Sequence, residues 1–323
     1  MTDGRSSRGR LIFVAANPSV DRLYELDRLT VGDIQRPVAV LAVAGGKGLN
    51  AARAAATLGG AVTAVGIVGG LSGDWIAGEF VRLGIAARWA RAAAETRTCM
   101  SILDRSSGAM TEIYERGAAI DPAVWPALES IVQAELGRGD VAAIAFSGSL
   151  PPGAPDDGYA RIARLASAAR DGSVPILADT YGSPLAALLA EHPAAIKVNA
   201  VEAGEASMLR ITDIASAAEA VAFLRSAGAE TVVITLGETG ALAAGPDGLA
   251  HLIPPDVRGP YPVGSGDAFL GAFAVGRGRG ETVVEAARFG LAAGIANAEV
   301  PGAGNLDPAR VAELLGRVEI RPI

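Results

Sequence analysis

Cysteine and histidine are almost absent from this sequence. Its 323 residues include one cysteine, Cys99, and two histidines, His192 and His251. A single cysteine excludes an internal disulfide and a cysteine-built metal site. Two histidines so far apart along the chain do not favour a histidine-based zinc site either. Disulfide-stabilised and zinc-dependent classes of protein are therefore disfavoured.

Aromatic residues and long basic runs are also scarce. Aromatic residues make up 5% of the chain although 50% of it is hydrophobic, so the core must be built from alanine, valine, leucine and isoleucine. The net charge is −7, which makes nucleic acids and anionic membranes poor candidates as main partners. If the substrate is an anion, the positive charges that bind it must be local.

Long hydrophobic runs are missing as well. The N-terminal residues 1–10 are polar and basic, and the apolar stretch that follows, 11–16, is too short for the core of a signal peptide. No segment reaches the length of a transmembrane helix. From these features we expect a soluble, cytoplasmic protein.

Short apolar runs alternate along the chain with alanine- and leucine-rich stretches of helical periodicity. The runs predict buried strands at 11–16, 62–68, 141–146, 174–178, 195–198 and 231–236. The stretches between them predict helices at 49–58, 74–83, 122–136, 156–169, 184–190, 216–227, 267–275, 283–298 and 307–315. Short, wholly apolar strands are typical of parallel sheets covered on both faces. The alternation therefore predicts a doubly wound α/β sheet.

Two stretches, 21–43 and 88–114, interrupt this alternation. Both lack helical periodicity, and Ser-Ser-Gly at 106–108 is typical of a turn between two extended runs. We expect these stretches to form a small accessory sheet. The length of the chain suits a single α/β domain with such an addition, so we expect one domain over residues 1–323.

A glycine-rich segment, residues 44–50 (AGGKGLN), follows an extended run and precedes a predicted helix. Backbone N–H groups at such a helix start can bind an anion or a polar ring, and Lys47 adds a positive charge. The spacing is neither that of a P-loop nor that of the dinucleotide fingerprint. Taken alone, the segment is equally compatible with ligand binding and with a tight structural turn.

A second glycine-rich segment, residues 263–269 (VGSGDAF), also leads directly into a predicted helix. The N–H groups there could stabilise charge on a phosphoryl group, and the Asp267 carboxylate could accept a hydroxyl proton. Position alone favours a simpler interpretation, in which Asp267 is the N-cap of the helix.

Three further segments follow predicted strands, where ligands of open α/β sheets gather. Residues 197–202 (KVNAVE) could order the waters of a magnesium ion or form a capping box between Asn199 and Glu202. Residues 235–240 (TLGETG) could bind a ligand or form a hairpin turn. Residues 146–153 (FSGSLPPG) offer hydroxyl and N–H groups to an anion or a sugar, and could equally be a plain loop.

Two single residues complete the candidate site. Asp21, just after the first predicted strand, could hold sugar hydroxyl groups, and Arg97 could bind a phosphate in a bidentate manner. A lone surface aspartate or arginine is more often simply solvated.

The order of these segments is more informative than any one of them. They are Asn-Pro-Ser-Val-Asp at 17–21, Gly-Gly-Lys-Gly-Leu-Asn at 45–50, Thr-Arg at 96–97, Ser-Gly-Ser-Leu-Pro-Pro-Gly at 147–153, Lys-Val-Asn-x-x-Glu at 197–202, Thr-Leu-Gly-x-x-Gly at 235–240 and Gly-Ser-Gly-Asp at 264–267. In this order they resemble the PfkB (ribokinase-like) carbohydrate kinase family, from about Leu11 to the C-terminus. The resemblance implies a ribokinase-like three-layer α/β/α sandwich with a mostly parallel central sheet. It also implies a small β-sheet lid formed by about 20–43 and 88–115.

The resemblance assigns a role to each position, with ATP and Mg²⁺ as cofactors and a monovalent cation as a further candidate. It implies that Asp267 is the catalytic base. The other implied roles are an anion hole of Gly264, Ser265 and Gly266; sugar and phosphate binding by Asp21, Gly45, Gly46, Lys47, Asn50, Arg97 and Ser149; and nucleotide binding by Asn199, Glu202, Thr235, Gly237, Gly240 and Asn297, with Gly294 near the adenine. Glu202 would hold magnesium through water, and a homodimer through the lid is expected.

Within the family, the motifs are most similar to those of the hexose-phosphate branch, the 1-phosphofructokinases and next the tagatose-6-phosphate kinases. This implies phosphorylation of fructose 1-phosphate to fructose 1,6-bisphosphate, with tagatose 6-phosphate and fructose 6-phosphate as alternatives. Four features depart from the pattern of that branch: Val198 stands at a usual proline, Cys99 and Tyr114 stand at usual asparagines, and residues 264–268 read GSGDA instead of GAGDS. None of the departures changes Asp267 itself.

Three rival interpretations remain from the sequence. A kinase for an unphosphorylated sugar or nucleoside would need neither Lys47 nor Arg97. A non-catalytic sugar- or nucleotide-binding regulator would have no use for Asp267 and its flanking glycines. A dinucleotide-dependent oxidoreductase would need a glycine fingerprint after the first strand, where residues 15–18 (AANP) stand instead.

Overall fold

The computed structural model describes residues 9–169, 174–246 and 248–323, so most of the polar N-terminal stretch lies outside the described ranges. Within those ranges the strands form one 10-stranded sheet and one 4-stranded sheet. The large sheet has the strand order β14-β13-β12-β11-β10-β9-β8-β1-β4-β5. In that order the strands are β14 (Glu319–Pro322), β13 (Gly248–Ile253), β12 (Ala241–Gly245), β11 (Val232–Thr235), β10 (Ala195–Asn199), β9 (Ile176–Asp179), β8 (Val141–Ser147), β1 (Arg10–Ala15), β4 (Val62–Gly69) and β5 (Ala86–Ala92).

The central strands of the large sheet are parallel and apolar on both faces. Every strand predicted from the apolar runs is present, and the strands from β4 through β1, β8, β9 and β10 to β11 pair in parallel. Alternate residues of each strand point to opposite faces, so Leu11 and Phe13 of β1 enter one core cluster, while Ile12 and Val14 enter the other. The antiparallel β12, β13 and β14 extend the sheet at one edge.

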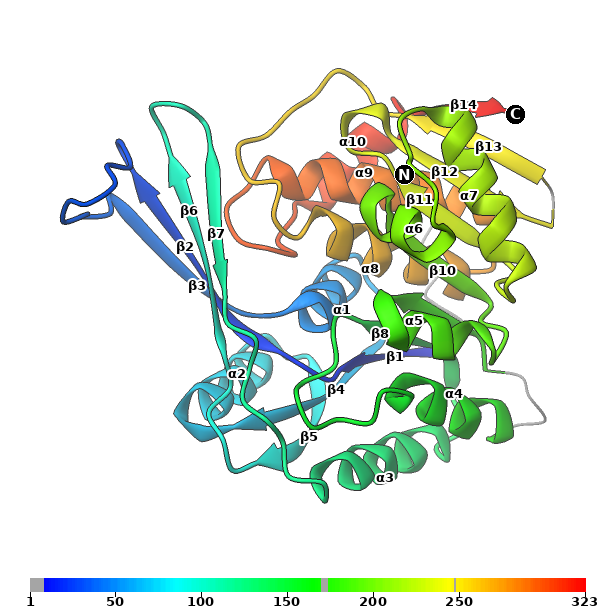
Figure 1. Ribbon diagram of the computed structural model, residues 1–323, viewed down its shortest axis with the longest axis horizontal. Coiled ribbons are helices and arrows are strands. Elements are labelled where there is room, and N and C mark those ends of the chain that lie inside the picture. The colour runs from blue at the N-terminus through cyan, green and yellow to red at the C-terminus, as the bar shows by residue number, and fades with distance from the viewer. Residues whose placement is uncertain (1–8, 170–173, 247) are drawn as a thin grey trace.

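Helices cover both faces of this sheet (Figure 1). One core cluster contains residues of α1 (Lys47–Thr57), α2 (Gly70–Arg82), α8 (Ser265–Gly278), α9 (Val283–Ala298) and α10 (Pro308–Leu315). The other contains residues of α3 (Val124–Leu136), α4 (Gly158–Ala168), α5 (Gly182–Leu189), α6 (Ala200–Ser207) and α7 (Ile214–Ser226). The predicted three-layer α/β/α fold is therefore confirmed. No helix in the described ranges is long and apolar enough to cross a membrane.

The small sheet has the order β3-β2-β6-β7 and projects from one side of the body (Figure 1). Its strands are β2 (Ser19–Leu26), β3 (Ala39–Gly45), β6 (Thr98–Asp104) and β7 (Met110–Tyr114). The second predicted accessory stretch, 88–114, begins too early. Its first residues belong to β5, which pairs with β4 in the large sheet and is not part of the small sheet. The alternation of apolar and polar residues in β5 suits the edge of a sheet as well as an accessory strand, so the pattern alone does not distinguish the two.

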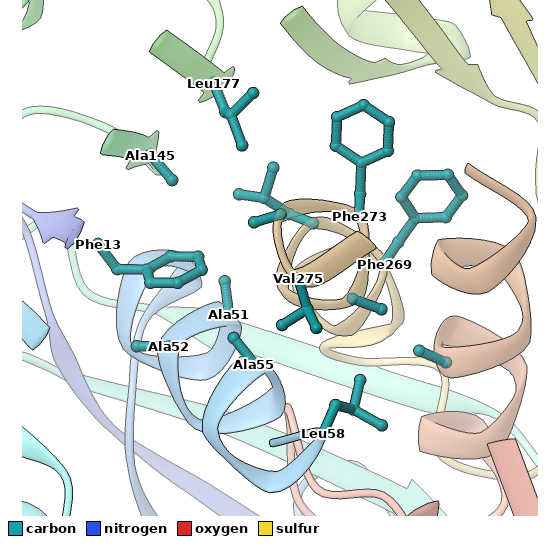
Figure 2. Packing of buried hydrophobic residues seen from close by; sticks show 14 of the residues in the cluster. Phe13, Ala51, Ala52, Ala55, Leu58, Ala145, Leu177, Phe269, Phe273 and Val275 are labelled. Atoms are coloured by element: carbon teal, nitrogen blue, oxygen red, sulfur yellow. The ribbon is translucent and has the colours of Figure 1, made fainter. Parts of the chain in front are cut away.

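Helices α1 and α8 pack closely against each other because small residues line their contact. Alanines of α1 and the apolar side chains of α8 meet in one core cluster (Figure 2). A Cβ atom added at Gly271 of α8 would lie 2.5 Å from the carbonyl oxygen of Ala51 and 3.0 Å from the backbone nitrogen of Ala55. Only glycine at this position lets the two backbones approach so closely.

We expect Gly271→Ala to reduce the free energy of unfolding by about 1–3 kcal/mol, because an extra methyl group must push the two helices apart. Urea denaturation followed by circular dichroism measures the change. Gly78→Ala in α2 is the matched control, since a Cβ added there meets no atom within 4 Å. That substitution should stabilise the protein by about 0.5–1 kcal/mol. Equal effects of the two substitutions would contradict this account of the α1–α8 contact.

Candidate functional site

A cleft of about 870 Å³ lies at the carboxyl ends of the parallel strands, beside the small sheet. Ligands of open α/β sheets bind at this edge because the loops and helix starts that follow the strands converge there. Most residues singled out from the sequence line the cleft: Asp21, Gly46, Lys47, Asn50, Arg97, Ser149, Asn199, Thr235, Gly237, Gly240, Gly264, Ser265, Gly266, Asp267 and Gly294. The structure therefore brings together residues that are as far apart in the sequence as Asp21 and Gly294.

Three of the predicted residues do not line the cleft. Gly45 lies behind Asp21, and a Cβ atom added there would come within 2.1 Å of the Asp21 carboxylate, so glycine is needed for that carboxylate to fit. Glu202 is buried behind Lys47, and its Oε1 atom accepts a hydrogen bond from the Nζ atom of Lys47. Asn297 is fully buried, and its amide accepts from the backbone N–H of Gly304 and donates to the carbonyl of Val263.

Asp267 is the third residue of α8 and is buried, with a relative exposure of 7%. The N-cap of α8 is Gly264, so the interpretation of Asp267 as an N-cap residue is wrong. The Oδ2 atom of Asp267 instead accepts a hydrogen bond of 3.0 Å from the Nδ2 atom of Asn50. Burial raises the pKa of Asp267 to about 7 and the nearby Asp179 adds to the rise, while Lys47, the Asn50 hydrogen bond and Lys197 oppose it.

Asp21 lies on β2 and is held close to Asp267 by a shared partner. Its Oδ2 atom accepts from the backbone N–H of Gly46 at 3.0 Å and from the Nδ2 atom of Asn50 at 3.1 Å. The hydroxyl of Ser19 donates to its other oxygen at 2.5 Å. Asn50 of α1 therefore bridges a carboxylate of the small sheet and a carboxylate of α8.

The start of α8 offers a positively polarised pocket next to Asp267. Gly264 has a φ of 87°, and a Cβ atom added there would lie 2.5 Å from the Cα atom of Ala303, so the turn is closely packed from behind. A Cβ atom added at Gly266 would lie 2.7 Å from the Nζ atom of Lys197. Free N–H groups at a helix start attract anions, and here the Lys197 ammonium group lies directly beside them.

Sequence reasoning missed Asp179 and gave Lys197 no role, yet both are central to the site. Asp179 ends β9 and is fully buried. Its two oxygens accept from the Nζ atom of Lys197 at 2.6 Å and from the Nζ atom of Lys47 at 3.0 Å. Burial opposes ionisation of this carboxyl group, but the two lysines hold the pKa of Asp179 below its ordinary value. The signal was a polar residue directly after a buried strand, as at Asn199.

Lys47 is shared between two carboxylates. Its Nζ atom lies 3.0 Å from Asp179 Oδ1 and 2.9 Å from Glu202 Oε1. Burial alone would favour the neutral amine, but Asp179 and Glu202 outweigh it and raise the pKa of Lys47. The ammonium group is therefore charged at neutral pH, and its side chain remains partly exposed to the cleft.

The end of the cleft away from the small sheet is formed by residues at the start of α6, at the end of β11 and in the turn that follows β11. The predicted capping box is present, since Asn199 Oδ1 accepts from the N–H of Glu202 and Glu202 Oε2 accepts from the N–H of Asn199, each at 2.9 Å. Thr235 ends β11, and the short 3-10 helix η1 (Gly237–Thr239) makes the predicted hairpin turn into β12. This turn also lines the cleft, so its structural and binding interpretations are compatible.

The end of the cleft near the small sheet contains Arg97, Cys99 and Tyr114. The guanidinium of Arg97 donates to the carbonyl oxygens of Glu115 at 2.8 Å and of Asn17 at 3.0 Å, which fixes its position at the base of β6. Cys99 is paired in register with Asp21 on one side and with Tyr114 on the other. Side chains in such a row share one face of a sheet, and Asp21, Cys99 and Tyr114 all line the cleft.

The arrangement as a whole suits proton abstraction next to an anion. A carboxylate whose pKa lies near 7 can accept a proton from a bound hydroxyl group. The adjacent helix start, Lys47 and Lys197 can stabilise negative charge that develops beside it. Transfer of an anionic group to a hydroxyl group is the class of reaction that needs both.

We expect Asp267→Asn to be more heat-stable than the wild type at pH 8 and no more stable at pH 4. The folded-state pKa of about 7 exceeds the value of about 3.9 for an unfolded aspartate, so the favourable contribution of the protonated acid is lost as the pH rises from about 4 to 7. Removing the buried charge should gain at most about 4 kcal/mol at pH 8. Thermal unfolding at both pH values measures this.

The matched control for this measurement is Asp213→Asn at the exposed N-cap of α7. The pKa of Asp213 is lowered by its hydrogen bonds with Ser216, so its substitution should bring no gain at pH 8. A lower melting temperature of Asp267→Asn than of the wild type at pH 8 would contradict the raised pKa.

Comparison with known proteins agrees with this chemistry. Residues 14–310 match the sequence model described as pfkB family carbohydrate kinase. The chain is 31% identical over 313 residues to a tagatose-6-phosphate kinase of Staphylococcus epidermidis, covering 96% of this chain and 99% of that protein. It is similar to the crystal structure of phosphofructokinase-2 from Escherichia coli in complex with potassium, at 25% identity and a TM-score of 0.86 over 96% of this chain and 99% of that one.

A third similarity concerns the fold alone. The crystal structure of a possible 1-phosphofructokinase from Thermotoga maritima has 18% identity and a TM-score of 0.86, covering 97% of this chain and 99% of that one. The match to the family spans most of the chain, and the cleft contains the family's motifs in one site. This protein is therefore a phosphotransferase of the PfkB carbohydrate kinase family.

Proposed function

We propose that this enzyme transfers the γ-phosphoryl group of ATP to a hydroxyl group of a hexose phosphate, with Asp267 as the catalytic base. The observation that carries the proposal is the buried Asp267 carboxyl group, whose pKa is raised to about 7 beside the start of α8. A base with a pKa near the working pH combines a large ionised fraction with a sufficient affinity for the proton. An aspartate at its ordinary pKa would be a weaker acceptor.

In the proposed reaction, the sugar hydroxyl oxygen attacks the γ-phosphorus in line with the bond to the β–γ bridging oxygen. As the new P–O bond forms and the bridging bond breaks, Asp267 takes the hydroxyl proton and ADP leaves with the bridging oxygen. The N–H groups of Gly264 and Gly266 and the ammonium groups of Lys47 and Lys197 stabilise the charge on the transferring group. The N–H of Ser265 instead donates to the carbonyl oxygen of Pro262.

ATP would lie along the far end of the cleft, between Asn199, the turn at Gly237 and Gly240, and Gly294. These residues line the cleft with backbone groups and small side chains, which suits close approach of phosphates and a planar base. Asn297 would act indirectly here, because it braces the Val263 carbonyl just before the start of α8. We retain a monovalent cation as a candidate cofactor, since the solved phosphofructokinase-2 is in complex with potassium.

Magnesium bound to the phosphates of ATP would supply further positive charge. The donor set fits an ion held mainly by phosphates and water, because Asn199 lines the cleft and the Glu202 carboxylate lies directly behind it. In the described residues no cluster of three or more histidine, cysteine, aspartate or glutamate side chains is arranged to hold a metal ion by itself. Asn199 and Glu202 would accordingly act through water.

The acceptor would lie against the small sheet, which would act as its lid. Asp21, Gly46 and Asn50 offer the oxygens and N–H groups that sugar hydroxyls require, and Arg97 and Ser149 lie at the same end of the cleft. A positive guanidinium group at that end suits an acceptor that already has a phosphate. The similarity to tagatose-6-phosphate kinase and phosphofructokinase-2 favours tagatose 6-phosphate or fructose 6-phosphate ahead of fructose 1-phosphate.

We also propose that two copies associate through the outer face of the small sheet. Val40, Met100 and Ile113 alternate with the cleft-facing residues of their strands, so they lie on the opposite face. Val40 is 55% exposed and Ile113 is 50% exposed. Exposed apolar side chains on one face of a small sheet are typical of an interface, and the inhibited form of phosphofructokinase-2 from Escherichia coli is tetrameric.

An acceptor panel tests the proposed reaction. Release of ADP should be fastest with tagatose 6-phosphate or fructose 6-phosphate, slower with fructose 1-phosphate, and slowest with fructose and ribose. Asp267→Asn should lower kcat with the best acceptor by at least about 10²-fold, because the hydroxyl then keeps its proton during attack. Its affinity for ATP should change little. Near-normal turnover of this variant would rule out Asp267 as the base.

Arg97→Ala distinguishes a phosphorylated from an unphosphorylated acceptor. If Arg97 binds the acceptor phosphate, the KM for the sugar phosphate should rise by about 10-fold or more, since a charged hydrogen bond is worth about 1.5–3 kcal/mol. The KM for ATP should not change. An unchanged KM for the acceptor would favour a neutral sugar or nucleoside, and no ADP release with any acceptor would favour a non-catalytic binding protein.

Association through the small sheet predicts that Ile113→Lys gives a monomer. Burying a new charge at an apolar contact is unfavourable, and light scattering after size exclusion measures the mass. Leu71→Lys in α2 is the control, since Leu71 is 83% exposed and lies outside the small sheet. A monomeric wild type, or a dimeric Ile113→Lys variant, would disprove this interface.

A further inference from the structure

Arg53 is a buried arginine that the family motifs and the proposed reaction leave unexplained. It lies in α1, one turn after Asn50, with a relative exposure of 6%. Its Nη2 atom donates to the Oδ1 atom of Asn50 at 3.0 Å and also contacts the carbonyl oxygen of Ala303. Among the described residues its Nε atom has no hydrogen-bond partner.

The burial of this guanidinium group is energetically costly. Burial lowers the pKa of Arg53 to about 10, while Asp21, Asp267 and Glu79 favour its charged form from beyond hydrogen-bonding distance. Arg53 makes no ion pair within 4 Å in the part of the chain that the structure describes. A buried charge without an adjacent partner destabilises a fold. An apolar side chain would pack here at less cost, so stability alone does not account for the arginine.

The hydrogen bonds of the Asn50 amide indicate what Arg53 does in the site. The Nδ2 atom of Asn50 donates to Asp21 at 3.1 Å and to Asp267 at 3.0 Å, so both of its N–H bonds are used. The Oδ1 atom at the other end of the amide must face a donor, and Arg53 supplies it. The guanidinium group thus fixes the direction in which the amide presents its N–H bonds to the two carboxylates.

Arg53 also contacts the backbone that supports the start of α8. The carbonyl oxygen of Ala303 accepts from its Nη2 atom. A Cβ atom added at Gly264 would lie 2.5 Å from the Cα atom of Ala303 and 2.6 Å from the backbone nitrogen of Gly304. One side chain therefore links the amide between the two carboxylates with the turn behind the proposed anion hole.

We propose that Arg53 is a positioning residue for phosphoryl transfer: it orients the Asn50 amide between Asp21 and Asp267 and braces the turn behind Gly264. This inference rests on the proposed role of Asp267 as the base. Arg53 itself touches neither the acceptor nor the base: it acts through its hydrogen bonds to Asn50 and Ala303 and through its positive charge. Its removal changes the direction of the Asn50 N–H bonds, and therefore the place and the ionisation of the base.

The effect on ionisation follows from the charges around Asp267. Asp179 of β9 and Asp21 of β2 are the nearby acidic groups, with Glu202 of α6 on Lys47 and Glu79 of α2 near Arg53. The cations are Lys47 and Arg53 of α1 and Lys197 of β10. Loss of one cation from this group makes the ionised carboxylate less favourable. The acidic limb of the pH–rate profile, which follows ionisation of the base, should therefore move to higher pH.

The test compares Arg53→Met with Arg53→Lys. In Arg53→Met, which keeps an unbranched apolar stem but removes the guanidinium donors and the charge, kcat should fall by about 10²-fold. The acidic limb of kcat/KM should move to higher pH. In Arg53→Lys, which keeps the charge but cannot reach both acceptors, the limb should stay near its wild-type position while kcat remains reduced. Assays use MgATP with tagatose 6-phosphate and fructose 6-phosphate.

Arg279→Met is the matched control. Arg279 also has a buried Nε atom without a partner among the described residues, and it donates to the carbonyl oxygen of Leu58 at the far end of α1. Its substitution should change the melting temperature but not the pH–rate profile. If Arg53→Met and Arg279→Met lower activity only in parallel with stability, Arg53 has a merely structural role and the inference is wrong.

A second measurement does not depend on turnover. Carboxyl ¹³C NMR of aspartate-labelled protein, with Asp267→Asn for assignment, should show Asp267 titrating at higher pH in Arg53→Met than in the wild type. If Arg53→Met does not fold, Arg53→Lys decides alone, and wild-type kcat in that variant overturns the inference. If Asp267→Asn is fully active, the proposed base is wrong. If that variant is inactive while Arg53→Met behaves like the wild type, only the role of Arg53 is wrong.

Discussion

The hydrogen bonds of the Asn50 amide are the interaction on which the rest of the site depends. One amide nitrogen binds Asp21 of the small sheet and Asp267 of α8, while Asn50 itself belongs to α1. Buried polar groups are almost always hydrogen-bonded, so these two hydrogen bonds hold the three elements in their relative arrangement. The close contact of α1 and α8 at Gly271 provides the rigid base on which that arrangement is built.

The charges of the site are balanced as a group and not in isolated pairs. Asp179 is buried between Lys47 and Lys197, and Lys47 is shared further with Glu202. Asp267 lies next to this cluster without an ion pair of its own in the described residues, which leaves its pKa raised to about 7. Charged groups buried in this way cost stability. The same burial gives the site a low local dielectric, which strengthens electrostatic effects on a reacting group.

Much of the fold could be predicted from the sequence because the spacing of apolar residues along the chain indicates which of them are buried. The apolar runs that became β1, β4, β8, β9, β10 and β11 are buried on both faces, and short runs of this kind leave few alternatives. The predictions were wrong where a local pattern had two solutions. The stretch that forms β5 was assigned to the small sheet, and the position of Asp267 taken alone favoured an N-cap role, although Gly264 is the N-cap of α8.

By itself, the sequence determined the α/β class, the order of the motifs and the family, because each of these depends on residue types at fixed spacings. Only the tertiary structure decided which charges lie together. Asp179 and Lys47 are 132 positions apart, and Asn50 and Asp267 are 217 positions apart. Contacts over such separations depend on how strands and helices pack, as do the desolvation and the neighbouring charges that set a pKa. For that reason the motif could locate Asp267 in the sequence, but only the packing of the fold places the Arg53 guanidinium group behind Asn50.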